Sequence, residues 1–331
     1  MSARILVLTA LVALTGSVAY WLGTEREQKS AEVQSQALMK GFSDSASAVN
    51  SITISNAQGV VFKATQQNGE WMANHLDTIQ RFPVNRQSLG ELISALREAT
   101  VLEPKTSNPE NYARLGLESL DNGDAQSVLL EVATGKQEWS LIIGNPASSG
   151  LGQYVREQGR AVSYLIDTTL SLPQSPSDWL EEDVLPFSAS DIEKVAMAFN
   201  RQPEMTFTRS DDDVAQPWTW EQKPRNGTLM FPGVIAQKVD QMAEFQYSAV
   251  APYVQHQWEE LVLIGDIVFT LSDGSEVFAY MTQADEEGIH KIWFSTPDSP
   301  HWVSDWVFAL NDYQASIFQV SAEQLLQSGD E

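Results

Sequence analysis

Apolar residues recur along this chain with two spacings, one typical of helices and the other of strands. Residues 84–99 predict a helix, because four apolar side chains follow at i, i+3, i+4 and i+7 and therefore share one face. These four are Leu89, Leu92, Ile93 and Leu96. Residues 234–247 predict a second helix, with an apolar face made by Ile235, Val239, Met242 and Phe245. Asn85 is placed to cap the first helix.

Shorter apolar runs that are bounded by turn residues predict strands. The runs around the first helix are 52–54, 60–65, 127–132, 139–143, 153–156 and 161–167. The runs around the second helix are 195–199, 205–209, 262–271, 276–281, 291–295 and 302–310. Asn68-Gly69 and Asp273-Gly274 predict tight hairpin turns, which favour antiparallel pairing. The predicted fold class is therefore α+β, with mainly antiparallel sheets that each pack against a helix.

The same landmarks precede both predicted helices. Trp71 and Phe82-Pro83 come before the first, and Trp220 and Phe231-Pro232 come before the second. The differences 220 − 71 and 231 − 82 are both 149. Self-similarity at a fixed offset indicates a duplicated structural unit. We therefore expect the two tryptophans to occupy equivalent buried positions in two similar units.

The chain before the first unit has a different character. Residues 5–22 carry no charge, and as a helix they would span about 27 Å, close to the hydrocarbon thickness of a membrane. Tyr20 and Trp21 stand at the far end, where aromatic rings favour the interface. The prediction is an uncleaved, single-pass anchor with the rest of the chain outside the cytoplasm. The alternative is a signal peptide that is cleaved after Ala19.

These patterns divide the chain into six segments. They are a transmembrane signal-anchor (1–24), a stalk (25–49), a first α+β unit (50–170), a linker rich in Pro and Ser (171–190), a second α+β unit (191–320) and a tail (321–331).

Charge and cysteine content exclude several kinds of function. The chain has 44 acidic and 20 basic residues, and its formal net charge is −24. Nucleic-acid binding rests on Lys and Arg that neutralise phosphates, so no nucleic-acid partner is expected. The absence of cysteine excludes disulfides, thiol catalysis and Cys-ligated metal centres. An acidic, well-solvated surface is favoured over a surface made for a basic protein partner.

The candidate sites for chemistry are incomplete. The glycine-rich stretch 144–152 follows a predicted strand but lacks the Lys-Ser/Thr of a phosphate loop, so a hairpin turn is favoured. Asp211, Asp212 and Asp213 lack EF-hand spacing, and an acidic loop is favoured over a calcium site. The stretch 285–288 is interpreted as an acidic turn between strands.

The remaining titratable residues also favour structural roles. The four histidines have no spacing typical of metal ligands; they are His75, His256, His290 and His301. The adjacent carboxylates Glu181-Glu182-Asp183 and Glu259-Glu260 do not face one another on a helix or a strand. No nucleophile elbow occurs. We predict no catalytic, cofactor or metal site. The ten tryptophans are expected to supply core mass, with an aromatic binding surface as the alternative.

Several short motifs resemble a known family when they are taken in order. They are Tyr112 with Leu115-Gly116-Leu117, Ile142-Ile143-Gly144, Tyr154-Val155-Arg156, Tyr164-Leu165-Ile166, Ser177-Asp178-Trp179-Leu180, Leu185-Pro186-Phe187 and Asp191-Ile192. The chain resembles, over roughly residues 50–320, a bacterial domain-of-unknown-function family. Its members are single-pass, outward-facing proteins of repeated α+β units, often encoded beside ABC transporters of the gliding-motility type. The second unit lacks the Gly-Leu loop and the Tyr-Val-Arg strand.

What the resemblance implies is a non-catalytic protein of the bacterial inner membrane, with most of the chain in the periplasm and with protein partners in the cell envelope. It would serve as an accessory or scaffold component of an ABC-type transport system. Two alternatives stay open. One is an envelope enzyme that acts on glycan or peptide through carboxylates, and the other is a protein that binds a small ligand between its units.

Overall fold

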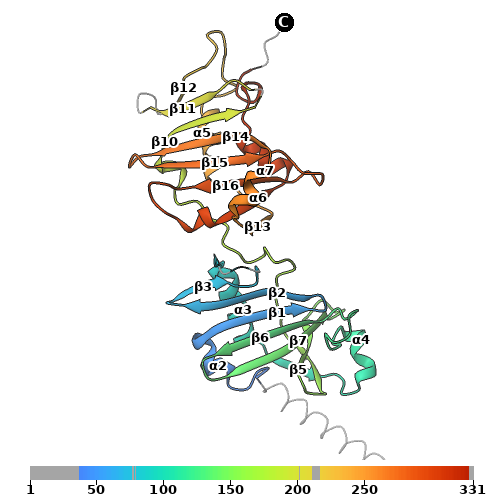
Figure 1. Cartoon of the computed structure of the whole chain (residues 1–331). Coiled ribbons are helices and arrows are strands. Elements are labelled where there is room, and N and C mark those ends of the chain that lie inside the picture. The colour runs from blue at the N-terminus through green and yellow to red at the C-terminus, as the bar shows by residue number, and fades with distance from the viewer. Residues whose placement is uncertain (1–36, 77, 79, 201, 211–216, 328–331) are drawn as a thin grey trace, which may run out of the picture. The chain divides into compact units, whose positions relative to one another are not determined.

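The computed structural model describes residues 37–76, 78, 80–200, 202–210 and 217–327. These residues form two compact units, one made by residues 37–75 with Arg81–Trp179 and the other mainly by residues 180–327. Each unit contains one antiparallel sheet (Figure 1). The predicted α+β class with mainly antiparallel sheets is confirmed.

The first sheet has nine strands in the order β4-β3-β2-β1-β6-β7-β8-β9-β5. The strands are β1 (Val49–Asn56), β2 (Gly59–Gln67), β3 (Glu70–Ala73), β4 (Phe82–Pro83), β5 (Val101–Pro104), β6 (Val128–Thr134), β7 (Glu138–Pro146), β8 (Gln153–Glu157) and β9 (Ser163–Ile166). The helices are α2 (Phe42–Ser45), α3 (Arg86–Glu98) and α4 (Tyr112–Leu115), with 3-10 turns η1 (Ala46–Ala48) and η2 (Pro109–Asn111).

The second sheet has eight strands in the order β12-β11-β10-β14-β15-β16-β17-β13. The strands are β10 (Ile192–Phe199), β11 (Met205–Arg209), β12 (Trp218–Trp220), β13 (Ala249–Pro252), β14 (Leu263–Leu271), β15 (Glu276–Thr282), β16 (His290–Ser295) and β17 (Trp306–Leu310). The helices are α5 (Val234–Ala243), α6 (Gln255–Glu259) and α7 (Asp312–Phe318), with 3-10 turns η3 (Ala189–Asp191), η4 (Trp302–Asp305) and η5 (Ala322–Gln324).

The two sheets have the same topology apart from β4. In each, the first strand of the unit lies inside the sheet, and the strand after the long helix crosses to the far edge. Even an irregularity is repeated: β1 carries one extra residue, Asn50, where it pairs with β6, and β10 carries Glu193 where it pairs with β14. Because the bulge lies at the same place in both ladders, it shows which residues of the two units correspond to each other. The duplication predicted from the sequence therefore exists in the fold.

The predicted equivalence of Trp71 and Trp220 is wrong. When the bulges are matched, Ala64 on β2 corresponds to Phe207 on β11. Ala73 pairs with Ala64, and Trp220 pairs with Phe207, so Trp220 stands where the first unit has Ala73.

The structural counterpart of Trp71 is Trp218. Trp71 pairs with Gln66 and Trp218 with Arg209, two residues further along each ladder. Both rings are buried, with exposed fractions of 9% and 5%. The connection between β11 and β12 is longer than the Asn68-Gly69 turn, so a constant sequence offset does not preserve the register.

The Phe-Pro landmark differs between the units for the same reason. Phe82 is fully buried in β4, beside Ala73 of β3. Phe231 is 46% exposed and belongs to no strand. Because Trp220 lies two residues further along its ladder than Trp71, the Phe-Pro pair that follows at the same spacing is displaced from the sheet.

The long helix of each unit buries one apolar face, as predicted. In α3 the Asn85 side chain accepts hydrogen bonds from the backbone N–H groups of Gln87 and Ser88, which confirms the predicted cap. Its buried residues are Leu89, Leu92 and Leu96, whereas Ile93 is half-buried. In the second unit α5 ends at Ala243, earlier than predicted, yet Phe245 beyond its end is still buried.

Two segments next to the predicted units also pack into them. The predicted stalk included residues 37–49, but Met39 and Phe42 are buried in the first unit and α2 contacts α3. Leu325, in the predicted tail, is fully buried, and its carbonyl accepts a hydrogen bond from the Met230 N–H. Apolar side chains in otherwise polar segments explain both extensions.

The predicted membrane anchor, residues 5–22, lies outside the described residues. Within the described ranges, no helix is both long enough and apolar enough to span a membrane.

Candidate functional site

Three of the motifs that carried the family resemblance, those that contain Tyr112, Ile142 and Tyr154, come together beside strands β7 and β8. Tyr112 of α4, Leu117 just after it and Ile142 of β7 form a small buried cluster. Leu115, Leu129 and Tyr154 pack against this cluster. A short helix that buries little surface of its own is thereby fixed to β7 and β8.

Two glycines permit the close approach of this loop to the sheet. Gly116 ends α4 with a φ of 65°, in the left-handed region that favours glycine. A Cβ on Gly144 of β7 would lie only 2.3 Å from the carbonyl oxygen of Leu115. A Cβ on Gly116 would lie 2.7 Å from Oδ1 of Asn145. The Gly-Leu loop and Gly144 of β7 therefore pack together and depend on each other.

Arg156 of β8 binds the same loop, residues 112–117, through its guanidinium group. Its side chain is 7% exposed, and Nη2 donates to the carbonyl oxygen of Leu117 at 3.0 Å. Nη1 donates to the carbonyl oxygen of Arg160 at 3.0 Å, and the guanidinium lies 4.4 Å from the centre of the Tyr112 ring. Among the described residues no carboxylate forms an ion pair with it. Carbonyl oxygens and an aromatic face therefore stabilise this buried cation.

Beside the anchored loop lies an open cavity of about 610 Å³. One wall is the end of β5 with Lys105 and Thr106. A second wall is α4 and the turn before it, with Asn111, Arg114 and Leu115. The remaining walls are the turn after β7 and strand β8, with Asn145, Pro146, Ser148 and Tyr154.

The charge of this cavity is opposite to that of the chain. Lys105 and Arg114 line it, and no Asp or Glu is among the described residues of its walls. Lys105 pairs with Glu103 outside the wall, and its Nζ lies 5.8 Å from the centre of the Tyr154 ring. By contrast, a cavity of about 570 Å³ in the second unit is lined by four carboxylates and no cation; they are Glu182, Asp183, Asp191 and Glu244.

The second unit has a hollow at the place that corresponds to the cationic cavity. It measures about 260 Å³ and lies between edge strand β13, helix α6 and strands β16 and β17. Its lining is mostly apolar and includes Val250, Trp258, Leu261 and Val307. The ladders place Lys291 on β16 where the first unit has Tyr154.

The residue of the second unit that corresponds to Arg156 is aromatic instead of charged. Trp293 occupies the β16 position that corresponds to Arg156. Its ring stacks on Tyr253 with the centres 4.2 Å apart, and Trp258 of α6 lies 6.0 Å away. An aromatic stack therefore replaces the cation–π contact and the carbonyl hydrogen bonds of the first unit.

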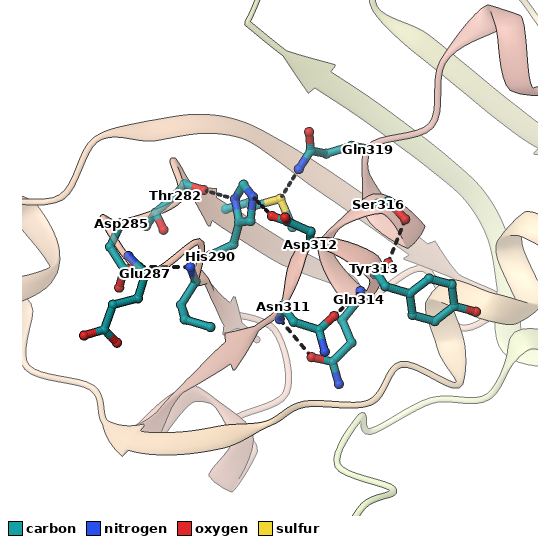
Figure 2. A network of polar contacts seen from close by, with 12 residues as sticks. Thr282, Asp285, Glu287, His290, Asn311, Asp312, Tyr313, Gln314, Ser316 and Gln319 are labelled. Carbon is teal, nitrogen blue, oxygen red and sulfur yellow. Dashed lines mark hydrogen bonds and ion pairs between the residues drawn. The ribbon is translucent and has the colours of Figure 1, made fainter.

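His290 lies in a polar network at the start of β16 (Figure 2). Its side chain is 13% exposed, Nδ1 donates to the carbonyl oxygen of Thr282 at 2.9 Å, and Nε2 lies 3.8 Å from Asp312 at the start of α7. The Thr282 hydroxyl accepts from the N–H of Lys291 instead. The histidine does not contact this hydroxyl, so the group is no nucleophile–base pair.

The ladder assigns His290 a packing role. It corresponds to Gln153 on β8, whose Nε2 donates to the carbonyl oxygen of Gly144 at 2.9 Å. Gly144 and Thr282 are themselves equivalent, so both units use a side chain at this position to bind the carbonyl of the neighbouring strand. This agrees with the interpretation of a boundary histidine.

The other sequence candidates lie apart from the cavity or form turns. Asp285 accepts hydrogen bonds from the N–H groups of Glu287 and Ile289 in the turn between β15 and β16, as predicted (Figure 2). The predicted hairpin turn at 144–152 is present but shorter, because residues 144–146 extend β7 and the turn runs from Ala147 to Gly152. The stretch supplies one wall of the cavity. Asp211, Asp212 and Asp213 lie outside the described residues. Among the described residues, no three His, Asp or Glu side chains gather as a metal site.

The tryptophans serve mainly as core. Of the nine that the structure describes, five are buried, namely Trp71, Trp218, Trp220, Trp258 and Trp306, and the other four are half-buried. The sequence did not reveal the cavity, because only the fold brings Asn145 and Tyr154 beside Lys105 and Arg114. The available signal was two cations flanking a motif loop in an acidic chain.

The architecture defines a duplicated α+β protein with a motif-bearing first unit. A family model for a domain of unknown function, DUF4340, matches residues 71–263, which is more than half of the chain. The chain therefore belongs to the DUF4340 family. No curated protein matches it.

Proposed function

We propose that this chain is a non-catalytic accessory protein of an ABC-type transport system in the bacterial cell envelope, and that it acts by binding. Residues 5–22 anchor it in the inner membrane, and the two units face the periplasm. The family resemblance supports the association with a transporter. The uncharged run at the N-terminus supports the anchor.

One observation carries the binding role. The motif residues Tyr112, Gly116, Gly144 and Arg156 all serve to hold α4 against the sheet, beside a cavity with polar, largely unpaired walls. A cavity of this size with a few polar side chains that converge on it is the usual form of a small-molecule site. The cavity beside this motif loop is thus a place for a ligand or a partner.

A pull-down from detergent-solubilised membranes tests the association. Full-length chain with a C-terminal tag should recover transporter subunits, identified by mass spectrometry. The variant Arg114→Glu, which reverses one charge of the cavity without touching the core, should recover fewer. Arg97→Glu, on the exposed face of α3, is the matched control and should behave like the unaltered chain. Recovery of no transporter subunit by the unaltered chain would refute the proposal.

The anchor has its own test. The membrane fraction should yield a chain whose mass includes residues 5–22, and alkaline carbonate should not release it. A mature chain that begins at Tyr20 and is released by osmotic shock would contradict the anchor.

A further inference from the structure

We infer that the cavity of the first unit binds a small organic anion, a molecule with a carboxylate or phosphate group together with hydroxyl or amide groups. This inference rests on the proposed binding role of the first unit and specifies the ligand. The volume of about 610 Å³ lies within the range of small-molecule sites.

The first argument is charge. The chain carries 44 acidic and 20 basic residues, yet the described walls of this cavity hold Lys105 and Arg114 and no carboxylate. In a molecule whose net charge of −24 repels anions, Arg114 beside Lys105, whose charge Glu103 partly offsets from outside the wall, makes this a place where an anion is bound favourably.

The second argument is that the donors other than Lys105, which pairs with Glu103, are unpaired within the described chain. Arg114 is exposed and forms no hydrogen bond or ion pair with the described chain. The side chains of Asn111, Asn145 and Ser148 line the same cavity and likewise have no hydrogen-bond partner in the described part of the chain. A guanidinium offers five N–H donors in a fork that matches carboxylate and phosphate oxygens.

The third argument is that the donors are positioned by rigid parts. Asn145 lies against Gly116, and Arg114 stands on the helix that Arg156 and Tyr112 hold to the sheet. Lys105 follows the β5 strand, and its backbone N–H donates to the Ser163 carbonyl. Tyr154 adds an aromatic surface at the cavity floor. The ligand therefore meets fixed charges and an apolar contact together, which lowers the entropic cost of binding.

Calorimetric titration of the full chain in detergent tests this inference with two matched pairs of probes. Glucuronate is compared with glucose, and glycerol 3-phosphate with glycerol, so that the carboxylate and the phosphate arms are separate. At least one anion should bind, its neutral partner should bind at least about tenfold more weakly, and added salt should weaken the anion's binding.

Variants then place the site. Arg114→Ala should weaken the anion about tenfold or more, because a charge-assisted hydrogen bond is lost. Arg97→Ala removes a cation from α3, outside the cavity, and should leave binding unchanged. Circular dichroism verifies that Arg114→Ala is folded, which is expected for an exposed residue without partners.

Three results would overturn the inference: neither anion binds, the neutral probes bind equally well, or Arg114→Ala and Arg97→Ala have the same effect. The outcome is independent of the pull-down, because transporter subunits are scored there and free anions here. An anion site without a transporter, or a transporter without an anion site, would each be recognised.

Discussion

In the first unit, the space between edge strand β5, helix α4 and strand β8 is lined by Lys105, Arg114 and amide side chains. In the second unit, the corresponding space between β13, α6 and β16 is smaller and lined by Val250, Trp258 and other apolar groups. The backbone order around both spaces is the same. The duplication thus kept a scaffold with a hollow at a fixed place, while the side chains that decide what enters it diverged.

The supports diverged together with the linings. Arg156 holds the first loop through carbonyl oxygens and the Tyr112 ring, whereas Trp293 holds the second through a stack with Tyr253. A polar support beneath a polar cavity and an aromatic support beneath an apolar hollow indicate that each site was altered as a unit. The following experiments address this comparison.

The largest effect is expected from the equivalent tryptophans Trp71 and Trp218. Trp71→Ala and Trp218→Ala should each lower the free energy of unfolding by about 3–5 kcal/mol, because each leaves a cavity in a buried layer. Each should shift mainly the calorimetric transition of its own unit, since the two cores are separate. Tyr313→Ala, at an exposed position, should change neither transition. A single transition displaced equally by both variants would contradict two independent cores.

The next largest effect on stability is expected at Arg156, whose side chain holds the α4 loop on β8. Arg156→Met should destabilise the first unit by about 2–3 kcal/mol, because the Leu117 carbonyl loses a charged donor and remains buried. Arg156→Lys should restore only part of this loss, since an ammonium cannot bind both carbonyls in the same fork. Urea unfolding measures the loss, and hydrogen exchange at the Leu117 N–H reports the release of α4. An Arg156→Met chain as stable as the parent would disprove the role given to the guanidinium.

A smaller difference in stability is expected between Gly144 of β7 and its counterpart Thr282 of β15. Gly144→Ala should cost about 1–3 kcal/mol, since the added methyl group would overlap the Leu115 carbonyl. Its counterpart Thr282→Ala should cost about 1 kcal/mol, the contribution of the hydrogen bond from Lys291. Thermal unfolding of both variants measures the two losses of stability. Equal losses would show that the close approach of α4 does not require glycine at position 144.

The smallest effect is a pH dependence confined to the second unit. Burial lowers the pKa of His301 below its ordinary value of 6.5, so the unfolded chain binds this proton more readily than the folded chain. The His301 contribution is therefore neutral above about pH 6.5 and becomes destabilising as the pH falls below it, down to the lowered pKa.

His301→Asn tests the assignment. Asparagine keeps an acceptor for the Val303 N–H at the start of η4 but does not titrate in this range. The second-unit transition of this variant should therefore decline less between pH 7 and pH 5 than that of the parent chain. An unchanged decline would place the titrating group elsewhere.

Local patterns predicted the central strands and the long helix of each unit, but they missed the edge strands β5 and β13 and the short helices α6 and α7. The structure also shows why they did not predict the register. The central strands and the Asn85 cap follow from neighbouring residues, so the sequence contains them. The match of Trp71 with Trp218 depends on hydrogen bonds along the ladder and on the length of the β11–β12 connection. A shared spacing between Trp and Phe-Pro suggested a different match, because loop length contributes to sequence distance but not to strand pairing.

The cavity was unpredictable for a related reason. Arg114 and Lys105 are separated by η2 and by the loop before it, and Tyr154 lies far along the chain. Their meeting depends on β5 crossing to the far edge of the sheet, beside β9. No hydrophobic period encodes that crossing, since period reports which face of an element is buried and not which neighbour it joins.

The crossing of β5 also sets an order of events as the chain emerges residue by residue. β5 ends at Pro104 but has no partner until β9 is complete at Ile166, which at 5–20 residues per second takes about 3–12 s. β13 waits in the same way for β17. Exchange of edge strands between two sheets of like topology is a hazard for a duplicated protein. Because β9 is complete well before Trp306, the first residue of β17, is made, the order of synthesis offers β5 its own partner before the competing strand exists.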